Sequence, residues 1–378
     1  MLLEQPLRVA LFTDTFVPQM NGVARTLARL RSALSARGHH VKVFTTTSPD
    51  APESDGVVRF PSVPFWAYRE MRLARPRQRE ALKELERFQP DVVHAATPFG
   101  VGLSGRWAAS ALKIPIVTSY HTSFVQYARY YGLAALAGPG TAFLRWFHNG
   151  GRRTFVPTDA IAEELRRVGF RGLRLWSRGV DTEQFHPQFR GAAVRNALGL
   201  AANGVVVSYV GRLAAEKGID VAMRAMQTVV AQRRGVGFAL AGDGPDETRC
   251  RRMAPTRTWF AGRLSDESLS AFYASSDIFV FPSTTDTFGN VLLEAMASGL
   301  AIVAADVPQS REVVGRDAGV FARAGDATEF AHAIASLVDD PNRLNRMREA
   351  ALARARARGW EAVFDRLTGD YRSAIQCP

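Results

Sequence analysis

Two acidic residues eight positions apart, Asp286 and Glu294, stand in a segment whose order of residue types suits ligand binding. An apolar run precedes the first acid, a helical pattern carries the second, and Gly289 lies between them. In an open α/β sheet this order places both carboxylates at the carboxyl edge of the strands, where ligands bind. Because a carboxylate accepts hydrogen bonds from two neighbouring hydroxyls, either acid suits a ribose or another sugar.

The residues around Gly289 predict an anion site beside these acids. Gly289 and the backbone N–H groups of Asn290 and Val291 would begin the helix, and a helix start attracts anions such as a diphosphate. A site for hydroxyls next to a site for phosphates fits a nucleotide sugar.

A cationic turn occurs earlier in the same half of the chain. The segment Gly211–Gly218, GRLAAEKG, places Arg212 and Lys217 between a strand pattern and the next helix. Two cations at the carboxyl end of a strand can neutralise a departing diphosphate. A solvated loop is the plain alternative, but the downstream glycine and acids favour function. The turn Gly242–Pro245, GDGP, is interpreted as structural or lining the site.

Two places in the first half could face the same ligand. Asn21 and Gly22 end a long strand-to-helix loop, and a glycine at a helix start lets the backbone approach a phosphate closely. His121 follows the strand pattern 114–119, so its side chain would reach sugar hydroxyls or phosphate. From this residue alone, a structural histidine is an equal alternative.

Other chemistries fit the sequence less well. Asp286 and Glu294 could form the acid and base of a hydrolase, but their place beside an anion site favours binding roles. The sequence has no Asp-x-Asp run after a strand, no Cys/His cluster with zinc spacing and no Ser/His/Asp order. We therefore expect a metal-free reaction that needs no cofactor besides its donor substrate.

Strand and helix patterns alternate twice along the chain, which predicts two Rossmann-like domains facing a central cleft. Strands are predicted at 7–12, 41–46, 91–96, 114–119, 154–157, 205–210, 237–241, 259–262, 277–282 and 300–304. Helices of the first half are predicted at 23–36, 100–112, 124–131, 141–149 and 159–168. The pattern breaks at 185–203, so we place the domains at 1–186 and 187–358. A last helix within 359–378 is interpreted as crossing back to the first domain.

Length and composition agree with a folded protein of two domains. The chain has 378 residues, of which 47% are apolar, and only two cysteines, Cys250 and Cys377. This excludes a disulfide framework and suggests a reducing compartment. The first residues do not resemble a signal peptide, and no apolar run reaches the roughly 18 residues of a membrane span. We expect a cytoplasmic protein.

The net charge of +12 is concentrated in the first half. Residues 1–190 hold 26 Lys and Arg against 15 Asp and Glu, or +11, whereas residues 191–378 hold 22 against 21, or +1. The segment 64–79 places three aromatic residues before five arginines, a pattern typical of a bilayer interface. These residues are Phe65, Trp66, Tyr68, Arg69, Arg72, Arg75, Arg77 and Arg79. An exposed loop and helix is the alternative to peripheral attachment at the inner face of an anionic membrane.

Taken together, the motifs resemble the retaining glycosyltransferases of family 4, which have the GT-B fold. That family carries two glutamates with the spacing of Asp286 and Glu294. The GRLAAEKG and GDGP turns, the segment Gly179–Pro187 (GVDTEQFHP) and the SYHT histidine follow the family's order over essentially the full chain. The TDTFVPQMNG and TDTFGN segments look most like bacterial mannosyl-, glucosyl- and sulfoquinovosyltransferases acting on lipids or lipid-linked acceptors.

The resemblance implies an α/β, GT-B protein and assigns roles to the residues above. Those implied to contact the donor diphosphate or the transferred sugar are His121, Arg212, Lys217 and Asp286. Those implied to bind the ribose or the phosphates are Asn21, Gly22, Gly289, Asn290, Val291, Leu292 and Glu294. The departing diphosphate would take the acceptor's proton, so no enzyme nucleophile is required.

The implied reaction moves a hexose with retention, mannose from GDP-mannose being the first expectation, to a lipid or lipid-linked acceptor. A UDP-sugar carrying glucose, galactose or sulfoquinovose, with a lipid or soluble acceptor, is the second. Asp286 stands where the family carries a glutamate, so whether it contacts the sugar stays open. The chain could also be a binding-only protein. The isoelectric point near 10.3 would suit a nucleic-acid-binding protein, but no helix-turn-helix, zinc-finger or RNP-like pattern occurs.

Overall fold

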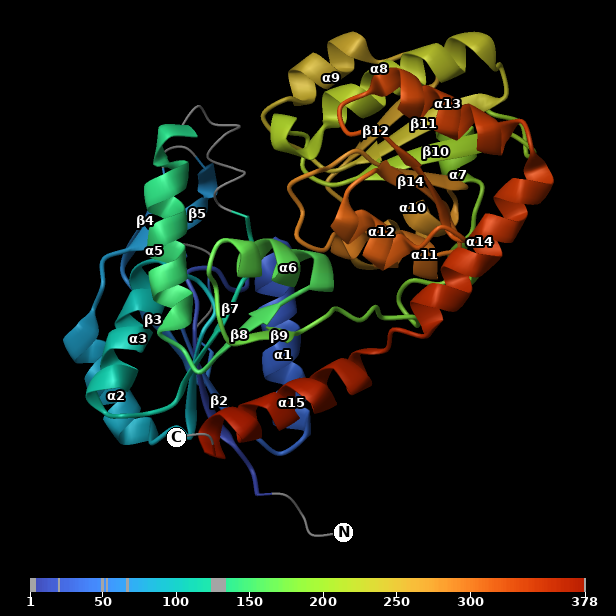
Figure 1. The fold of residues 1–378 in the computed structure, drawn as a ribbon. Coiled ribbons are helices and arrows are strands. Elements are labelled where there is room, and N and C mark those ends of the chain that lie inside the picture. Colours follow the sequence, from blue (N-terminus) through green and yellow to red (C-terminus); the bar gives the residue numbers. More distant parts are fainter. Residues whose placement is uncertain are drawn as a thin grey trace. The chain divides into compact units, whose positions relative to one another are not determined.

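The computed structural model describes residues 5–19, 21–48, 51, 54–65, 68–123 and 134–376. They fall into two compact units (Figure 1). Unit 1 comprises the described residues within 1–121, 135–177 and 361–378, and unit 2 those within 122–134 and 178–360. The helix predicted at 124–131 and Cys377 lie outside the described residues.

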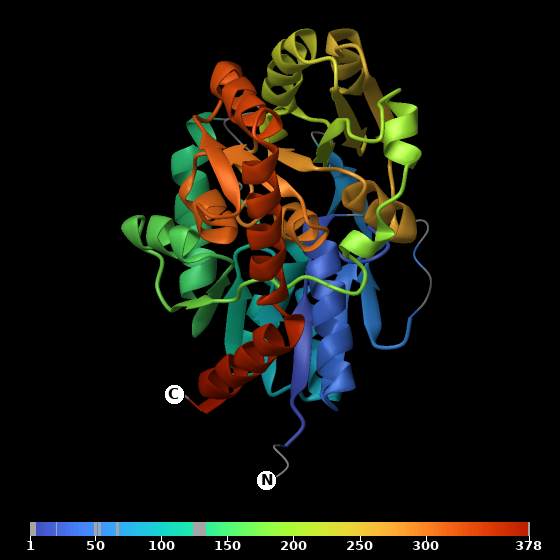
Figure 2. The same ribbon diagram turned by 90° about the vertical axis from the view of Figure 1, so that its right-hand side faces the viewer.

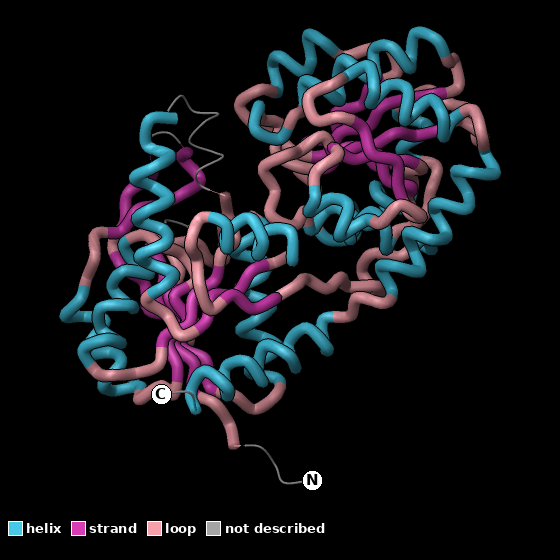
Figure 3. The backbone as a smooth tube through the Cα atoms, viewed as in Figure 1, coloured by secondary structure: helices cyan, strands magenta, loops and turns pink. Residues whose placement is uncertain are grey.

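Unit 1 is built on a sheet of seven parallel strands in the order β3-β2-β1-β6-β7-β8-β9. The strands are β1 Arg8–Phe12, β2 His40–Thr46, β3 Val57–Phe60, β6 Val92–Ala95, β7 Ile116–Ser119, β8 Arg153–Val156 and β9 Leu173–Leu175. Its helices include α1 Gly22–Ala36, α2 Gln78–Phe88, α3 Gly100–Ala111, α5 Ala137–Asn149, preceded by the 3-10 turn η1 Ala134–Leu136, and α6 Asp159–Arg167. Helices lie on both faces of the strands (Figure 3), which explains why the strands are apolar runs without alternation.

The segment with three aromatic residues and five arginines contains an antiparallel hairpin that the sequence pattern did not predict. Its strands are β4 Ser62–Phe65 and β5 Tyr68–Ala74. The Arg72 guanidinium donates to the Ser62 hydroxyl at 3.0 Å and to its carbonyl at 2.8 Å, and Arg77 pairs with Glu80 at 3.0 Å. Trp66 lies outside the described residues. At least these two arginines therefore have partners within the unit.

The last helix, α15 Trp360–Gln376, packs against the sheet of unit 1, although the residues before it form unit 2 (Figure 2). Its buried face carries Phe364, Leu367 and Tyr371. The Arg152 guanidinium donates to the carbonyl of Ala374 at 2.7 Å and so ties the end of the helix to the start of β8.

Unit 2 has six parallel strands in the order β12-β11-β10-β13-β14-β15. The strands are β10 Val205–Val210, β11 Val236–Ala241, β12 Thr258–Gly262, β13 Ile278–Phe281, β14 Ala301–Ala305 and β15 Gly319–Ala322. The helices are α7 Ala193–Ala197, α8 Ile219–Gln232, α9 Glu247–Met253, α10 Asp266–Ala274, α11 Asn290–Ala297, α12 Pro308–Val314, α13 Ala327–Val338 and α14 Pro341–Arg356, with 3-10 turns η2 Pro187–Phe189 and η3 Ala215–Lys217.

The predicted α/β fold with two parallel sheets is confirmed. Every strand predicted from the sequence is present, with ends shifted by two residues at most. In each sheet the strand order reverses once, between β1 and β6 in unit 1 and between β10 and β13 in unit 2. Loops that follow two such neighbouring strands diverge to opposite faces, and the opening between them is where doubly wound sheets bind ligands.

Candidate active site

The turn after β10 is held in place by the GDGP turn after β11. A Cβ atom added at Gly242 would lie 2.0 Å from the carbonyl oxygen of Gly211, and one at Gly244 would lie 2.3 Å from that of Leu213. The Leu213 N–H donates to the Asp243 carbonyl at 2.8 Å. The two glycines therefore permit a backbone contact that fixes the cationic turn, which agrees with their structural interpretation.

Arg212 is held by a buried carboxylate that the sequence did not single out. Its Nη1 lies 3.4 Å from Oε1 of Glu216, whose side chain is only 3% exposed. The Glu216 carbonyl accepts a hydrogen bond from the Thr285 hydroxyl at 2.9 Å, and the Arg212 carbonyl accepts one from the Tyr209 hydroxyl at 2.8 Å. The rule that pairs residues four positions apart holds on helices, and Arg212 lies before the 3-10 turn, so the sequence carries no signal for this pair.

Two of the predicted site residues come together at the switch point of unit 2. Lys217 Nζ lies 2.6 Å from Asp286 Oδ1, and both side chains are partly exposed, at 19% and 24%. The contact joins the loop after β10 to the loop after β13, which are neighbours in the sheet. A lysine ammonium has three donor hydrogens, so Lys217 can hold Asp286 and an anionic oxygen at the same time.

Gly289 starts helix α11 in a conformation that suits glycine. Its φ is +79°, and an added Cβ would lie 2.9 Å from Cζ of Phe281. Asn290 and Val291 follow as the first helical residues, whose N–H groups have no acceptor within a helix. The N–H of Leu292 differs, because it donates to the Gly289 carbonyl at 2.9 Å. In this conformation the Leu292 N–H is engaged within the turn, and the anion site at the start of α11 stays a prediction.

Glu294 is oriented by a residue that the sequence analysis missed. The hydroxyl of Tyr273, from α10, donates to Glu294 Oε2 at 3.0 Å. The tyrosine is fully buried, with its ring against those of Phe185 and Phe279 at centroid distances of 5.7 and 5.9 Å. In the sequence Tyr273 reads as an apolar core residue of a helix, and nothing along the chain links it to Glu294.

In unit 1, the predicted residues Asn21 and Gly22 lie where α1 begins. Asn21 caps the helix, since its Oδ1 accepts from the Ala24 N–H at 2.9 Å while its Nδ2 donates to the Thr15 hydroxyl at 2.8 Å. Gly22 is the first helical residue. Both therefore help to form a helix start at the switch point of this sheet.

The loop between β1 and α1 also carries Asp14, a buried acid. Its carboxylate accepts from the Thr97 hydroxyl at 2.6 Å and from the Val101 N–H at 2.9 Å. Burial outweighs these hydrogen bonds and raises the pKa of Asp14 to about 6. Asp14 thus ties the loop to the first turn of α3.

His121 follows β7, as predicted, and is half-buried. Its Nε2 lies 2.8 Å from the Ser119 hydroxyl, and its ring meets that of Trp176 edge to face at 5.5 Å. The histidine is therefore held on two sides within unit 1.

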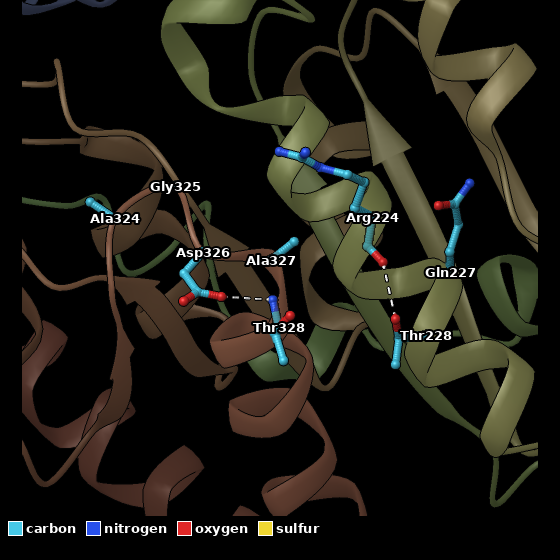
Figure 4. Close-up of a pocket in the computed structure, with 8 residues that line it drawn as sticks. All are labelled: Arg224, Gln227, Thr228, Ala324, Gly325, Asp326, Ala327 and Thr328. Atoms are coloured by element: carbon cyan, nitrogen blue, oxygen red, sulfur yellow. Dashed lines mark hydrogen bonds between the residues drawn. The ribbon is translucent and has the colours of Figure 1, made fainter.

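An open pocket elsewhere in unit 2 contains none of the predicted residues. It lies between α8 and the turn before α13 and is lined by polar and small side chains, including Arg224, Gln227 and Asp326 (Figure 4). Among the described residues, no three His, Cys, Asp or Glu side chains are grouped so that they could hold a metal ion. None of the helices in the described part of the chain has the length and hydropathy of a membrane span.

Comparisons with known proteins agree with these features. Residues 20–184 match the sequence model of Glycosyltransferase Family 4, and residues 204–340 match that of Glycosyl transferases group 1. The chain is 30% identical to a GDP-mannose-dependent alpha-mannosyltransferase of Corynebacterium glutamicum, over 98% of this chain and 90% of that one. A protein with the same description from Mycobacterium tuberculosis is 33% identical, over 97% and 96%.

The chain is also similar to a glycolipid synthase and to a solved structure. An alpha-monoglucosyldiacylglycerol synthase of Streptococcus pneumoniae is 29% identical over 82% of this chain and 73% of its own. Sucrose-phosphate synthase of Thermosynechococcus elongatus shares the fold with a TM-score of 0.78 at 22% identity, covering 97% of this chain and 98% of that one. The chain belongs to glycosyltransferase family 4 and has the GT-B fold.

Proposed function

We propose that this glycosyltransferase moves mannose from GDP-mannose to a lipid or lipid-linked acceptor, with retention and without a metal ion. The observation that carries the proposal is the Lys217–Asp286 pair at the switch point of unit 2. It lies in the same two loops as Arg212 and the start of α11, so cationic and backbone donors accompany an acceptor of hydroxyl hydrogens. The mannosyltransferase relatives support the choice of donor.

In the proposed reaction, Arg212, Lys217 and the first turn of α11 hold the diphosphate. The bond between the anomeric carbon and the diphosphate oxygen breaks as the acceptor oxygen attacks the same face. The electron pair of that bond goes to the diphosphate, which takes the proton of the acceptor hydroxyl. The two cations supply the charge neutralisation that a divalent ion supplies in other transferases. No cofactor besides the donor enters this scheme.

A UDP-sugar is the second candidate donor, supported by the glucosyldiacylglycerol synthase relative. A panel of nucleotide sugars distinguishes the two, because a ligand that binds the folded state raises its melting temperature. We expect GDP-mannose and GDP to stabilise the protein, and UDP-glucose, UDP-galactose and UDP-sulfoquinovose to leave the melting temperature unchanged. GDP release with lipid acceptors and EDTA, and the anomeric coupling of the product, then test turnover, metal independence and retention.

The outcomes of these experiments distinguish the candidate donors, a binding-only protein and the proposed mechanism. Stabilisation by UDP-sugars alone would replace GDP-mannose by the second candidate. Binding of a donor without nucleotide release, in the presence of every lipid acceptor tried, would favour a binding-only protein. A product with inverted anomeric configuration, or activity abolished by EDTA, would contradict the proposed mechanism.

Peripheral attachment to an anionic membrane is part of the proposal, and an exposed apolar stripe in unit 1 supports it. Leu136, Phe143 and Trp146 are 56%, 37% and 54% exposed, and their spacing places them on one face of η1 and α5. The Arg106 guanidinium lies 4.1 Å from the Trp146 ring centroid. Aromatic residues beside arginine fit the interface of an anionic bilayer.

Replacing these three residues with serine should lower binding to anionic vesicles by tenfold or more. Each buried aromatic or leucine side chain contributes about 1.5–3 kcal/mol, of which interfacial insertion captures a part. Vesicle co-sedimentation measures the change, and Phe189→Ser, which alters an exposed aromatic of unit 2 at 39% exposure, is the control. Equal vesicle binding by the triple variant and the wild type would remove this stripe from the proposal.

A further inference from the structure

Four side chains of unit 1 form a continuous hydrogen-bonded chain that ends at His121. The Tyr371 hydroxyl lies 2.8 Å from His94 Nδ1, and His94 Nε2 lies 2.9 Å from the Ser119 hydroxyl. The same Ser119 hydroxyl lies 2.8 Å from His121 Nε2. The chain thus runs from α15 through β6 and β7 to the loop that carries the predicted site histidine.

The interior part of this chain is closed to water. Tyr371 and His94 are fully buried, and Ser119 is 2% exposed. Aromatic rings enclose them: Phe155 lies 5.7 Å from His94 and 5.8 Å from Tyr371, and Trp176 lies 5.8 Å from His94. Because an unsatisfied buried donor costs about 1–3 kcal/mol, the hydrogens must be arranged so that each donor meets an acceptor.

Among the hydrogen bonds that join the described residues of this chain, one arrangement gives every donor an acceptor. Among the described residues, the Tyr371 hydroxyl has His94 Nδ1 as its hydrogen-bond partner, so it donates to that nitrogen. Neutral His94 then carries its proton on Nε2 and donates to Ser119. The Ser119 hydroxyl, having accepted one hydrogen bond, donates its own hydrogen to His121 Nε2. In the reverse direction the Tyr371 hydrogen would have no acceptor in the described part of the chain.

We propose that this chain fixes His121 as the neutral tautomer that carries its proton on Nδ1. Its three inner members are positioning residues, since they act through His121. In this tautomer Nε2 accepts the Ser119 hydrogen and Nδ1 carries the proton, so neither nitrogen of neutral His121 has a lone pair left to take a further proton. Resting on the proposed function, this excludes His121 as the base for the acceptor hydroxyl and agrees with the diphosphate taking that proton.

The tautomer can be observed directly by long-range ¹H–¹⁵N correlation of histidine ring nitrogens, with the His121 signals assigned from a His121→Gln variant. We expect the wild type, without donor, to show protonated Nδ1 and unprotonated Nε2 at His121. Ser119→Ala should give a mixture of tautomers and a kcat lower by about tenfold, with the donor KM changed less than twofold, as for one lost hydrogen bond. Tyr371→Phe should also give a mixture of tautomers and a lower kcat, each by less than in Ser119→Ala.

Ser104→Ala is the matched control, because it removes a buried hydroxyl of unit 1 that donates to the Gly100 carbonyl and lies outside the chain. It should leave the His121 signals and kcat unchanged. Protonated Nε2 in the wild type, or an unchanged tautomer in both Ser119→Ala and Tyr371→Phe, would overturn the proposal. Unchanged turnover in Ser119→Ala would overturn the positioning role. If no donor releases its nucleotide while the spectra behave as expected, the proposed function fails and the tautomer assignment stands.

Discussion

Lys217→Ala is expected to lower kcat by about 10²- to 10³-fold, the range seen when one preorganised charge-stabilising group is removed. The ammonium group is lost from a position 2.6 Å from Asp286, at the carboxyl edge where the diphosphate is proposed to bind. The effect has a second component, because the Asp286 carboxylate is left without its partner close to an anionic leaving group. Release of nucleotide under donor saturation measures kcat directly.

A double variant separates these two components. If the unpaired Asp286 carboxylate repels the diphosphate, Lys217→Ala/Asp286→Asn should recover part of the activity that Lys217→Ala loses, and the coupling follows from the double-mutant cycle. Lys83→Ala removes a lysine charge from the exposed face of α2 and serves as control. Near-normal turnover by a correctly folded Lys217→Ala would show that its assigned role is wrong.

Most strands of the two sheets could be predicted from sequence because parallel strands buried on two faces are short apolar runs between turn residues. The strands that were missed lack this signature. β3 keeps three of its four residues partly exposed, and β15 has two partly exposed residues. The β4–β5 hairpin contains Pro64 and three charged residues, so its composition indicated a surface segment and not a strand pair.

Site residues could be found from the sequence, but their partners could not. Asp286, Lys217 and Glu294 were recognised from residue type, spacing and position at strand ends. Lys217 meets Asp286 across 69 positions because β10 and β13 are neighbours while β11 and β12 lie on the other side of β10. That order is a property of the assembled sheet, so local pattern carries no information about it.

The same limit applies to polar atoms that reach the site from buried positions. Tyr273 lies in an apolar helix, and His94 lies in the middle of a buried strand. The periodicity of the sequence predicts that both are core residues, and both are buried in the structure. What distinguishes them is the polar atoms of their side chains, whose partners are known only once the tertiary contacts are known.

Glu294→Gln is expected to weaken binding of the nucleotide by about 10- to 100-fold, because hydrogen bonds to a charged acceptor contribute about 1.5–3 kcal/mol. In the proposed complex the carboxylate accepts both ribose hydroxyls while Tyr273 donates to Oε2 at 3.0 Å. A glutamine offers one acceptor oxygen and an NH₂ group, so it cannot accept from the tyrosine and from both hydroxyls in the same geometry.

The ribose assignment can be tested with a matched ligand as well as matched variants. The wild type should bind the 2′-deoxynucleotide more weakly than the ribonucleotide, and Glu294→Gln should discriminate between them much less, as measured by titration calorimetry. Tyr273→Phe should weaken nucleotide binding by about three- to tenfold, since it removes one hydrogen bond that orients the carboxylate but keeps the carboxylate. Glu267→Gln, on the exposed face of α10, is the control for charge loss in unit 2. Because discrimination between the two nucleotides depends on the 2′-hydroxyl alone, its retention in Glu294→Gln would place the ribose contact on another residue even if overall affinity fell.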